Sequence, residues 1–227
     1  MSDTPPVAPI PARTVSGADL ALELLDPGSV PLFRLFRFPN ADWEETPPEY
    51  RNERTDPPAD HKRDFAVLYL GNTLPGVAME CRVLKIDYED NLTWYPALAA
   101  QYQVARYAFD KPAVFLPIDG PNRRRLGLDG AHRRLASKEP FQQAALALFE
   151  RYHTVVHGLS WESMHRNQPS RIYALWHEHK VTIGLSTVPA DRRYALLPDD
   201  AAWKVFLREN PDVGSFDVAP PAPPPAA

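Results

Sequence analysis

Proline constrains this chain more than any other residue type, because its fixed φ and missing amide donor exclude it from helix interiors and central strands. The 227 residues include 26 prolines, roughly twice the usual share of about 5%. They crowd the two ends and one internal stretch, 39–58. We therefore expect extended tails over 1–16 and 214–227 around a single domain at 17–213. The internal stretch is expected to be a long surface loop, of the kind that often carries functional residues.

The composition excludes several classes of protein. Hydrophobic residues make up 44% of the chain and charged residues 24%, which is typical of a globular domain. The formal net charge of -4 gives no general attraction to nucleic acid. The longest apolar runs, such as residues 66–70, are far too short to span a membrane. The first residues lack the features of a secretory signal, and Cys81 is the only cysteine, so we expect a cytoplasmic protein without disulfides.

Short strands and helices alternate irregularly along the domain. Runs rich in β-branched and aromatic residues predict strands, and apolar residues at helical spacing predict helices. The expected strands are 31–38, 65–70, 83–87, 113–118, 154–159 and 172–176, and the expected helices are 18–25, 74–81, 95–109 and 139–152. This order lacks the regular repeat of a doubly wound sheet. We therefore expect an α+β fold in which helices flank a small mixed sheet.

Histidine spacing raises the question of a metal site. His153 and His157 have the i, i+4 spacing of a zinc-binding helix. The β-branched residues between them favour a strand, in which four residues span about 13 Å, too far for both to bind one ion. His177 and His179 fit a metal no better. We expect no metal site and keep a histidine-based, metal-dependent hydrolase as a less favoured alternative.

Two further motifs have plain structural interpretations. Arg123, Arg124 and Arg125 are the best candidates for nucleic-acid binding, but no aromatic residues are interleaved with them, which favours a solvated basic loop. Cys81 lies on the apolar side of the helix expected after Thr73, which favours an inert core thiol over a nucleophile. We therefore expect no direct nucleic-acid binding.

Three polar residues interrupt otherwise apolar segments. Arg34 lies within Leu-Phe-Arg-Leu-Phe, Glu80 lies on the helix after the clearest strand, and Ser163 follows another strand. Taken singly, each has a structural explanation: a snorkelling arginine, a solvated glutamate and a capping serine. Their order along the chain is more informative than any one of them.

The motifs that surround these residues resemble the RES domain, a family named for its arginine, glutamate and serine. They are Phe33-Arg34, Arg54-Thr55-Asp56-Pro57-Pro58, the strand 65–70, Glu80 eleven residues after Tyr69, the helix at 142–147, His157-Gly158-Leu159-Ser160-Trp161-Glu162-Ser163 and the strand 173–176. The match covers roughly residues 32–177. It departs from the family where no glycine precedes Arg54, where Thr55 replaces an aromatic residue and where His157 replaces an aspartate, and residues 84–138 are not aligned.

The resemblance implies a fold similar to that of ADP-ribosyltransferase toxins and cleavage of the bond between nicotinamide and ribose in NAD. NAD is the substrate, no cofactor is implied, and water, phosphate as a co-substrate, or a protein side chain is the acceptor. Members are commonly toxins paired with an Xre-like, DNA-binding antitoxin, and the resemblance leaves a homodimer open. The rival interpretation is a RES-like module that has lost turnover and binds proteins.

The resemblance also assigns roles to five residues. Glu80 would stabilise the developing ribose cation, and Arg34 and Arg54 would hold the pyrophosphate or a phosphate. Tyr69 would stack on or hydrogen-bond the nicotinamide or ribose, and Ser163 would orient the substrate. Glu80, Arg34 and Ser163 are thus the expected catalytic residues. The expected substrate-binding residues are Arg34, Arg54, Tyr69 and Ser163.

Overall fold

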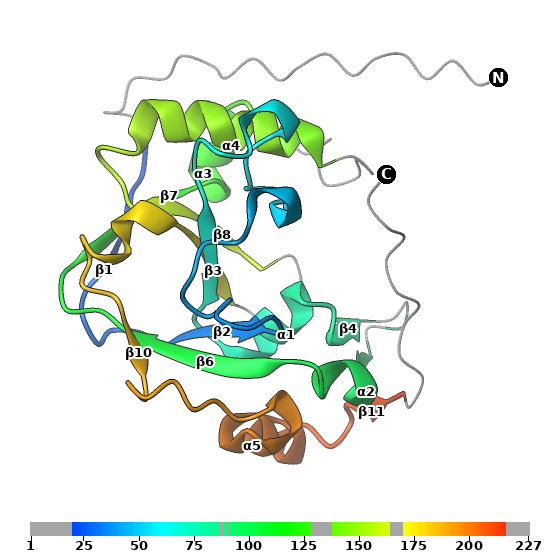
Figure 1. Ribbon diagram of the computed structural model, residues 1–227. Helices are drawn as coiled ribbons and strands as arrows, with labels where there is room; N and C mark the ends of the chain where they lie inside the picture. The colour runs from blue at the N-terminus through cyan, green and yellow to red at the C-terminus, as the bar shows by residue number, and fades with distance from the viewer. Residues whose placement is uncertain (1–19, 87–88, 90, 129–137, 164–169, 217–227) are drawn as a thin grey trace.

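Short runs of leucine, aromatic and β-branched residues form one mixed sheet of eight strands, which is curled (Figure 1). The computed structural model describes residues 20–86, 89, 91–128, 138–163 and 170–216. Its strands follow the order β1-β7-β8-β9-β3-β2-β6-β10 and are antiparallel apart from the pair β7 and β8. They run over Glu23–Leu25 (β1), Leu32–Phe36 (β2), Val67–Gly71 (β3), Gln103–Ala108 (β6), Ala113–Pro117 (β7), Gly158–Glu162 (β8), Arg171–Trp176 (β9) and Ser186–Val188 (β10). The α+β class expected from the sequence is confirmed.

Helices cover different parts of the sheet. The helix α4 (Glu139–Tyr152) packs against β3, β7, β8 and β9, and the short α3 (Gly120–Arg125) lies beside it (Figure 1). At the opposite end of the molecule, α1 (Leu74–Glu80) and α5 (Ala201–Glu209) share a core with β2 and β6. A small sheet, ordered β11-β5-β4, and α2 (Pro96–Ala99) complete that end. Its strands are Leu84–Ile86 (β4), Leu92–Trp94 (β5) and Gly214–Ser215 (β11).

The strands β2 and β3 pair at one position and then diverge. Phe33 opposes Gly71, whereas β2 pairs with β6 along its whole length, from Leu32 to Phe36. Divergence leaves room between the two strands for the side chain of Arg34. This separation positions the functional site.

Residues 37–66, which connect β2 to β3, form the long loop expected over 39–58. Two 3-10 turns, Pro48–Tyr50 and Ala59–His61, are its regular elements. The buried guanidinium of Arg51 organises the loop from within, because it donates hydrogen bonds to the carbonyl oxygens of Thr46, Lys62 and Phe65 at 2.7, 2.7 and 2.8 Å. Each of these bonds satisfies a carbonyl that irregular backbone would otherwise leave without a partner.

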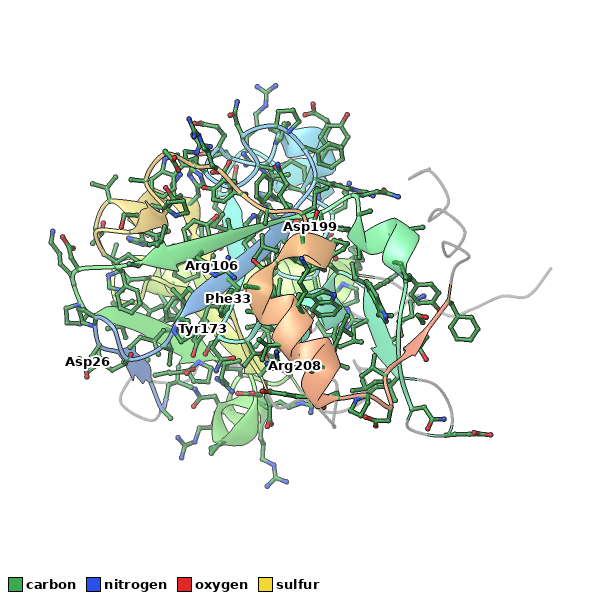
Figure 2. The ribbon with its side chains drawn as sticks, turned by 90° about the horizontal axis from the view of Figure 1, so that it is seen from below. Asp26, Phe33, Arg106, Tyr173, Asp199 and Arg208 are labelled. Atoms are coloured by element: carbon green, nitrogen blue, oxygen red, sulfur yellow. The ribbon has the colours of Figure 1, made fainter. Side chains whose placement is uncertain are left out.

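The helix α5 was not expected from the sequence. It begins at Asp200, whose carboxylate accepts hydrogen bonds from the amides of Ala202 and Trp203. Figure 2 shows this helix alongside Phe33 and Arg106, and the guanidinium of Arg106 lies 5.5 Å from the centroid of the Phe33 ring. Beyond α5, β11 pairs with β5, so the chain is still packed on the body after Val213, the boundary expected from the sequence. Among the described residues, none of the helices is long and apolar enough to cross a membrane.

Two predicted helices are wrong where the structure describes them. The segment predicted as a helix over 18–25 contains the edge strand β1, whose Glu23 opposes Phe115 of β7; residues 18–19 lie outside the described residues. The segment 95–109 is helical only in α2 and then becomes β6, which joins the sheet between β2 and β10. In both cases pairing with distant strands outweighs local helix propensity.

The remaining predictions hold with shifted boundaries. The strand predicted over 154–159 begins only at Gly158, because residues 153–155 continue the turn that ends α4. The strands at 31–38, 65–70, 83–87, 113–118 and 172–176 are present as β2, β3, β4, β7 and β9. The helices at 74–81 and 139–152 are present as α1 and α4.

Candidate functional site

Arg34 lies where β2 and β3 separate. Its Nε donates a hydrogen bond to the carbonyl oxygen of Ala41 at 2.9 Å, and Nη1 donates to that of Tyr69 at 3.1 Å. The side chain thus ties the start of the long loop to β3. These two bonds use two of the five N–H donors of the guanidinium.

Glu80 is the last residue of α1, which faces the same region. The helix begins at Thr73, whose hydroxyl accepts a hydrogen bond from the amide of Gly76 at 3.1 Å. Although Glu80 is exposed to solvent, protein surrounds its carboxyl group closely enough that desolvation raises its pKa. The positive charge of Arg54 and a hydrogen bond from Ser163 oppose this increase in pKa.

Ser163 approaches Glu80 from the end of β8. Its hydroxyl lies 3.5 Å from Oε1 of Glu80, at the outer limit of a hydrogen bond. The Ser163 amide donates to the carbonyl of Ser170 at 2.7 Å, and the Ser170 hydroxyl donates to Oδ1 of Asn72 at 3.2 Å. These contacts fix Ser163 to the strands β3 and β9, while the long distance to Glu80 leaves the carboxylate able to accept another donor.

Gly76 allows α1 to sit against this group. A Cβ at position 76 would lie 2.0 Å from the hydroxyl oxygen of Ser170. A larger residue would push α1, and with it Glu80, away from Ser163. Neither Gly76 nor Asn72 was identified from the sequence, because their roles depend on a residue nearly 100 positions away.

Arg54 approaches Glu80 from the long loop. Its guanidinium lies 5.0 Å from the centroid of the Phe141 ring on α4, and its charge lowers the pKa of Glu80. Its neighbour Arg51 serves the loop backbone instead and also pairs with Glu45 at 2.8 Å. Of these two arginines, Arg54 is thus the one whose charge acts on Glu80.

The hydroxyl of Tyr69 is engaged on two sides by the long loop. It donates a hydrogen bond to Oδ1 of Asp56 at 3.0 Å and accepts one from the hydroxyl of Thr55 at 2.9 Å. Desolvation, followed by the negative charge of Asp56, raises the pKa of Tyr69 well above its ordinary value. The edge of the Tyr69 ring faces Trp161, with centroids 6.5 Å apart. Tyr69 is thus a neutral hydroxyl of fixed orientation.

Asp56 is a functional candidate that the sequence analysis did not single out. Its side chain is buried, and Oδ2 accepts a hydrogen bond from the amide of Glu53 at 2.7 Å. Burial raises its pKa, partly opposed by that amide and by Tyr69. The available sequence signal was its position directly after Arg54 and Thr55 and before two prolines.

The structure brings together all five residues expected from the sequence. The links are Arg34 to Tyr69, Arg54 to Glu80 and Glu80 to Ser163, and the consecutive residues 54–56 join Arg54 to Tyr69. This group of side chains, the candidate site, thus combines two guanidinium groups, a carboxylate of raised pKa and two hydroxyls. This set can hold a phosphate-containing ligand and stabilise a cation that develops beside it.

The histidines have structural partners. Nδ1 of His157 accepts a hydrogen bond from the amide of Val114 at 2.8 Å, and a ring nitrogen of His179 lies 2.8 Å from the carbonyl oxygen of His153. Among the described residues, no three metal-ligating side chains lie close enough together to hold an ion. The expectation that 153–157 is a strand is wrong, since His153 follows the end of α4.

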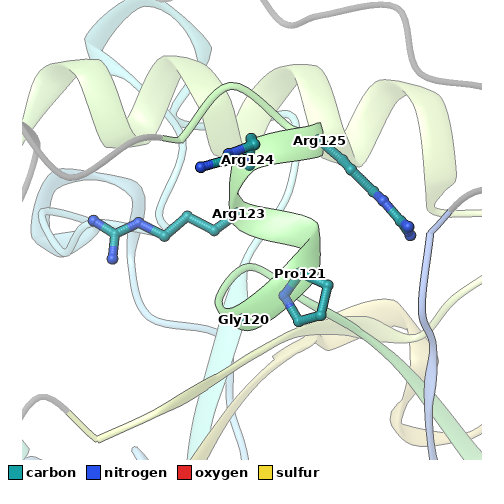
Figure 3. Close-up of a pocket in the computed structure, with 5 residues that line it drawn as sticks. All are labelled: Gly120, Pro121, Arg123, Arg124 and Arg125. Carbon is teal, nitrogen blue, oxygen red and sulfur yellow. The ribbon is translucent and has the colours of Figure 1, made fainter.

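The arginine cluster lies on α3 and lines a shallow pocket with Gly120 and Pro121 (Figure 3). Arg123 and Arg125 extend in different directions from the helix (Figure 3), and Nε of Arg123 donates to the carbonyl of Leu128 at 2.7 Å. The two arginines at 133 and 134 lie outside the described residues.

Elsewhere, burial raises the pKa of Cys81 to about 12, as expected for an inert thiol.

Comparisons with known proteins place the candidate site in context. The model of the RES domain family matches residues 31–198, a range that contains all five site residues. None of the curated proteins matches the sequence. A solved structure, the M. tuberculosis MbcT–MbcA toxin–antitoxin complex, has a chain that is similar with 13% sequence identity and a TM-score of 0.47. That similarity covers 75% of the chain studied and 85% of the solved one.

Proposed function

The chain belongs to the RES domain family, and on that premise we propose that it is an enzyme that cleaves the nicotinamide–ribose bond of NAD. The observation that carries this proposal is the position of Glu80, a carboxylate of raised pKa on which the charge of Arg54 acts and whose Oε1 lies 3.5 Å from the Ser163 hydroxyl. Perturbed carboxylates of this kind are typical of sites that act on developing charge.

The chemistry requires electrostatic stabilisation more than proton transfer. The nicotinamide ring nitrogen carries a positive charge in NAD, so nicotinamide departs neutral and needs no general acid. Positive charge develops on the ribose as the bond breaks. The Glu80 carboxylate would accept a hydrogen bond from a ribose hydroxyl and stabilise that charge, a contribution of about 3 to 4 kcal/mol for one well-placed group.

The two arginines would bind the phosphates. Arg34 retains donors beyond its two bonds to carbonyl oxygens, and Arg54 lies near Glu80. Forked, charge-assisted hydrogen bonds from such guanidinium groups suit a pyrophosphate or an inorganic phosphate. Ser163 would orient the ribose from the end of β8, and Tyr69 would contact the nicotinamide side. We further propose that the protein acts as a toxin whose partner is an Xre-like antitoxin.

The direct test is to incubate the purified protein with NAD, with and without inorganic phosphate, and to measure nicotinamide release. We expect release in the wild type and its loss in Glu80→Gln. Dependence on phosphate would identify a phosphorylase, phosphate-independent release a hydrolase, and labelling of a protein acceptor a transferase. NAD binding without release would support the binding-module alternative, and loss of activity with a chelator would support the histidine-based one.

A further inference from the structure

We propose that Asp56 is a positioning residue, which accepts the hydrogen bond of the neutral Tyr69 hydroxyl and so presents the oxygen of that hydroxyl to the substrate as a hydrogen-bond acceptor. The ligand group that it accepts from would be the carboxamide N–H of nicotinamide. This inference rests on the proposed function, because it concerns how the same candidate site distinguishes its substrate.

The hydrogen bonds of Tyr69 determine the polarity of its hydroxyl. A phenolic hydroxyl has one proton to donate and two lone pairs to accept with. The proton is directed to Oδ1 of Asp56 at 3.0 Å, and one lone pair receives the hydroxyl of Thr55 at 2.9 Å. One lone pair remains, so a ligand that meets this hydroxyl must bring its own N–H or O–H.

The arrangement is held rigidly. Asp56 is only 4% exposed, and its second oxygen receives the amide of Glu53 at 2.7 Å. The carboxylate therefore cannot turn away from Tyr69 without losing its hydrogen bond from the Glu53 amide. The Tyr69 backbone is fixed as well, because its carbonyl accepts from Arg34 at 3.1 Å.

The surroundings of Tyr69 favour the nicotinamide ring over the ribose as the group in contact. The Tyr69 and Trp161 rings lie nearly perpendicular with centroids 6.5 Å apart, and each offers an aromatic surface against which a nicotinamide ring could pack. The ribose hydroxyls would already be served by Glu80. On the nicotinamide side of NAD, the donor left for Tyr69 is the carboxamide N–H of the leaving group.

A substrate analogue isolates this contact. In 3-acetylpyridine adenine dinucleotide a methyl group replaces the carboxamide NH2, so the shape and carbonyl remain and the donor is lost. For each protein variant we would measure the ratio of kcat/KM for NAD to that for the analogue. Comparing this ratio between variants cancels the intrinsic reactivity of the two dinucleotides.

Two substitutions should reduce the preference of the enzyme for NAD over the analogue. Tyr69→Phe removes the acceptor, and the ratio should fall about 2- to 13-fold from the wild-type value, the worth of one net hydrogen bond. Asp56→Asn should lower it similarly. Its single amide oxygen can serve either the Glu53 amide or Tyr69, and pairing with the Glu53 amide turns its NH2 toward the Tyr69 oxygen. The tyrosine proton is then released to face the substrate.

Asp42→Asn is the matched control. Asp42 is a buried carboxylate of the same loop, 2% exposed, and it too accepts from a tyrosine, Tyr194, at 2.8 Å. Its substitution should lower the melting temperature and leave the ratio unchanged. A ratio that changes equally in Asp42→Asn and Asp56→Asn would overturn the proposal, since it would report only a loosened loop.

Binding of the two dinucleotides, measured by calorimetry, separates this inference from the proposed function. If the wild type cleaves NAD but neither Tyr69→Phe nor Asp56→Asn alters the ratio, the inference alone is overturned. Absence of cleavage would overturn the proposed function. In that case the role of Asp56 would still be supported if the wild type binds NAD more tightly than the analogue and both variants lose this preference. A preference that the variants keep would overturn it. If Asp56→Asn does not fold, Tyr69→Phe decides the outcome.

Discussion

Two regions of this molecule compensate their carboxylates in different ways. On the side of β6 and β10, Asp42 accepts from two nitrogens of Arg192 at 2.7 and 2.5 Å, and Asp200 accepts from Arg106 at 2.7 and 2.8 Å. Burial by itself would raise the pKa of Asp42, but the bonds and charge of Arg192 and the hydroxyl of Tyr194 outweigh it, so that pKa is lowered.

In the candidate site, neutral groups donate the hydrogen bonds to the carboxylates, and the charge of Arg54 opposes the desolvation of Glu80 without outweighing it. Asp56 accepts hydrogen bonds from Tyr69 and from the amide of Glu53, and Glu80 accepts a long one from Ser163. Desolvation raises the pKa of both carboxyl groups. A carboxylate that forms an ion pair with an arginine stabilises the fold. A carboxylate whose desolvation is only partly compensated can still interact with positive charge on a ligand. The comparison predicts opposite consequences of mutation in the two regions.

The largest effect should come from Glu80→Gln. The amide keeps the size of the side chain and removes the charge that answers the ribose cation, so kcat for NAD cleavage should fall about 100- to 1000-fold. The melting temperature should not fall. The matched control is Glu209→Gln, at an exposed position on α5, which should retain full turnover. Wild-type turnover in Glu80→Gln would contradict the role given to the candidate site.

Asp42→Ala should show the inverse result. It leaves Arg192 and Tyr194 without their acceptor, and because the Arg192 side chain is 36% exposed, water replaces part of the loss. We expect the free energy of unfolding to fall by about 1 to 3 kcal/mol, measured by urea titration. Turnover per folded molecule should stay near the wild-type value. A loss of turnover as large as that of Glu80→Gln would remove the distinction between the two regions.

The pH dependence of stability should have opposite signs at the two aspartates. The pKa of Asp42 is lowered by folding, so its stabilisation is present above the unfolded-state pKa and is lost as the pH falls through the folded-state pKa. The pKa of Asp56 is raised, so its contribution is present at low pH and is lost as the pH rises through the folded-state pKa.

The measurement is the free energy of unfolding from acidic to neutral pH. As the pH rises, the stability of Asp56→Asn should increase relative to that of the wild type. The stability of Asp42→Asn should decrease relative to that of the wild type. The same sign for both variants would show that the two carboxylates are compensated alike.

The sequence predicted the parts of the fold whose signals are local. The strand β3 and the helix α4 follow from runs of apolar residues and from helical spacing within a dozen positions. The strands β1 and β6 do not, because β1 is formed by pairing with residues about 90 positions away in β7, and β6 by pairing with β2 and β10. Leucine and alanine in these two segments favour helix until those partners are present.

The site was predictable to a similar extent. The order of short motifs along the chain selected Arg34, Arg54, Tyr69, Glu80 and Ser163, which the structure places near one another. Asp56 lies beside Arg54 in the sequence, but its role is apparent only when its oxygen meets the hydroxyl of Tyr69. Residues that touch a ligand carry recognisable chemistry in the sequence, whereas a residue that orients another one is recognised by geometry.

A smaller effect should follow from Arg54→Gln. The charge of Arg54 lowers the pKa of Glu80, so its removal should raise that pKa and move the acid limb of the kcat/KM profile to higher pH. This change would widen the difference in carboxyl pKa between the candidate site and the β6–β10 side. Arg208→Gln, at an exposed position on α5, is the control and should leave the limb in place. An unmoved limb in Arg54→Gln would mean that Glu80 does not govern it.

The smallest effect should come from Ser163→Ala. Its hydroxyl lies 3.5 Å from Glu80, so a net hydrogen bond of ~0.5 kcal/mol, the low end of the usual range, predicts about a 2-fold loss of kcat. The same bond lowers the pKa of Glu80, so the acid limb should also shift slightly to higher pH. A loss of 10-fold or more would show that Ser163 closes on the ribose when substrate binds. The side chains of the candidate site would then move closer to the ligand on binding. The carboxylates of the β6–β10 side, which pair with arginines, would remain fixed.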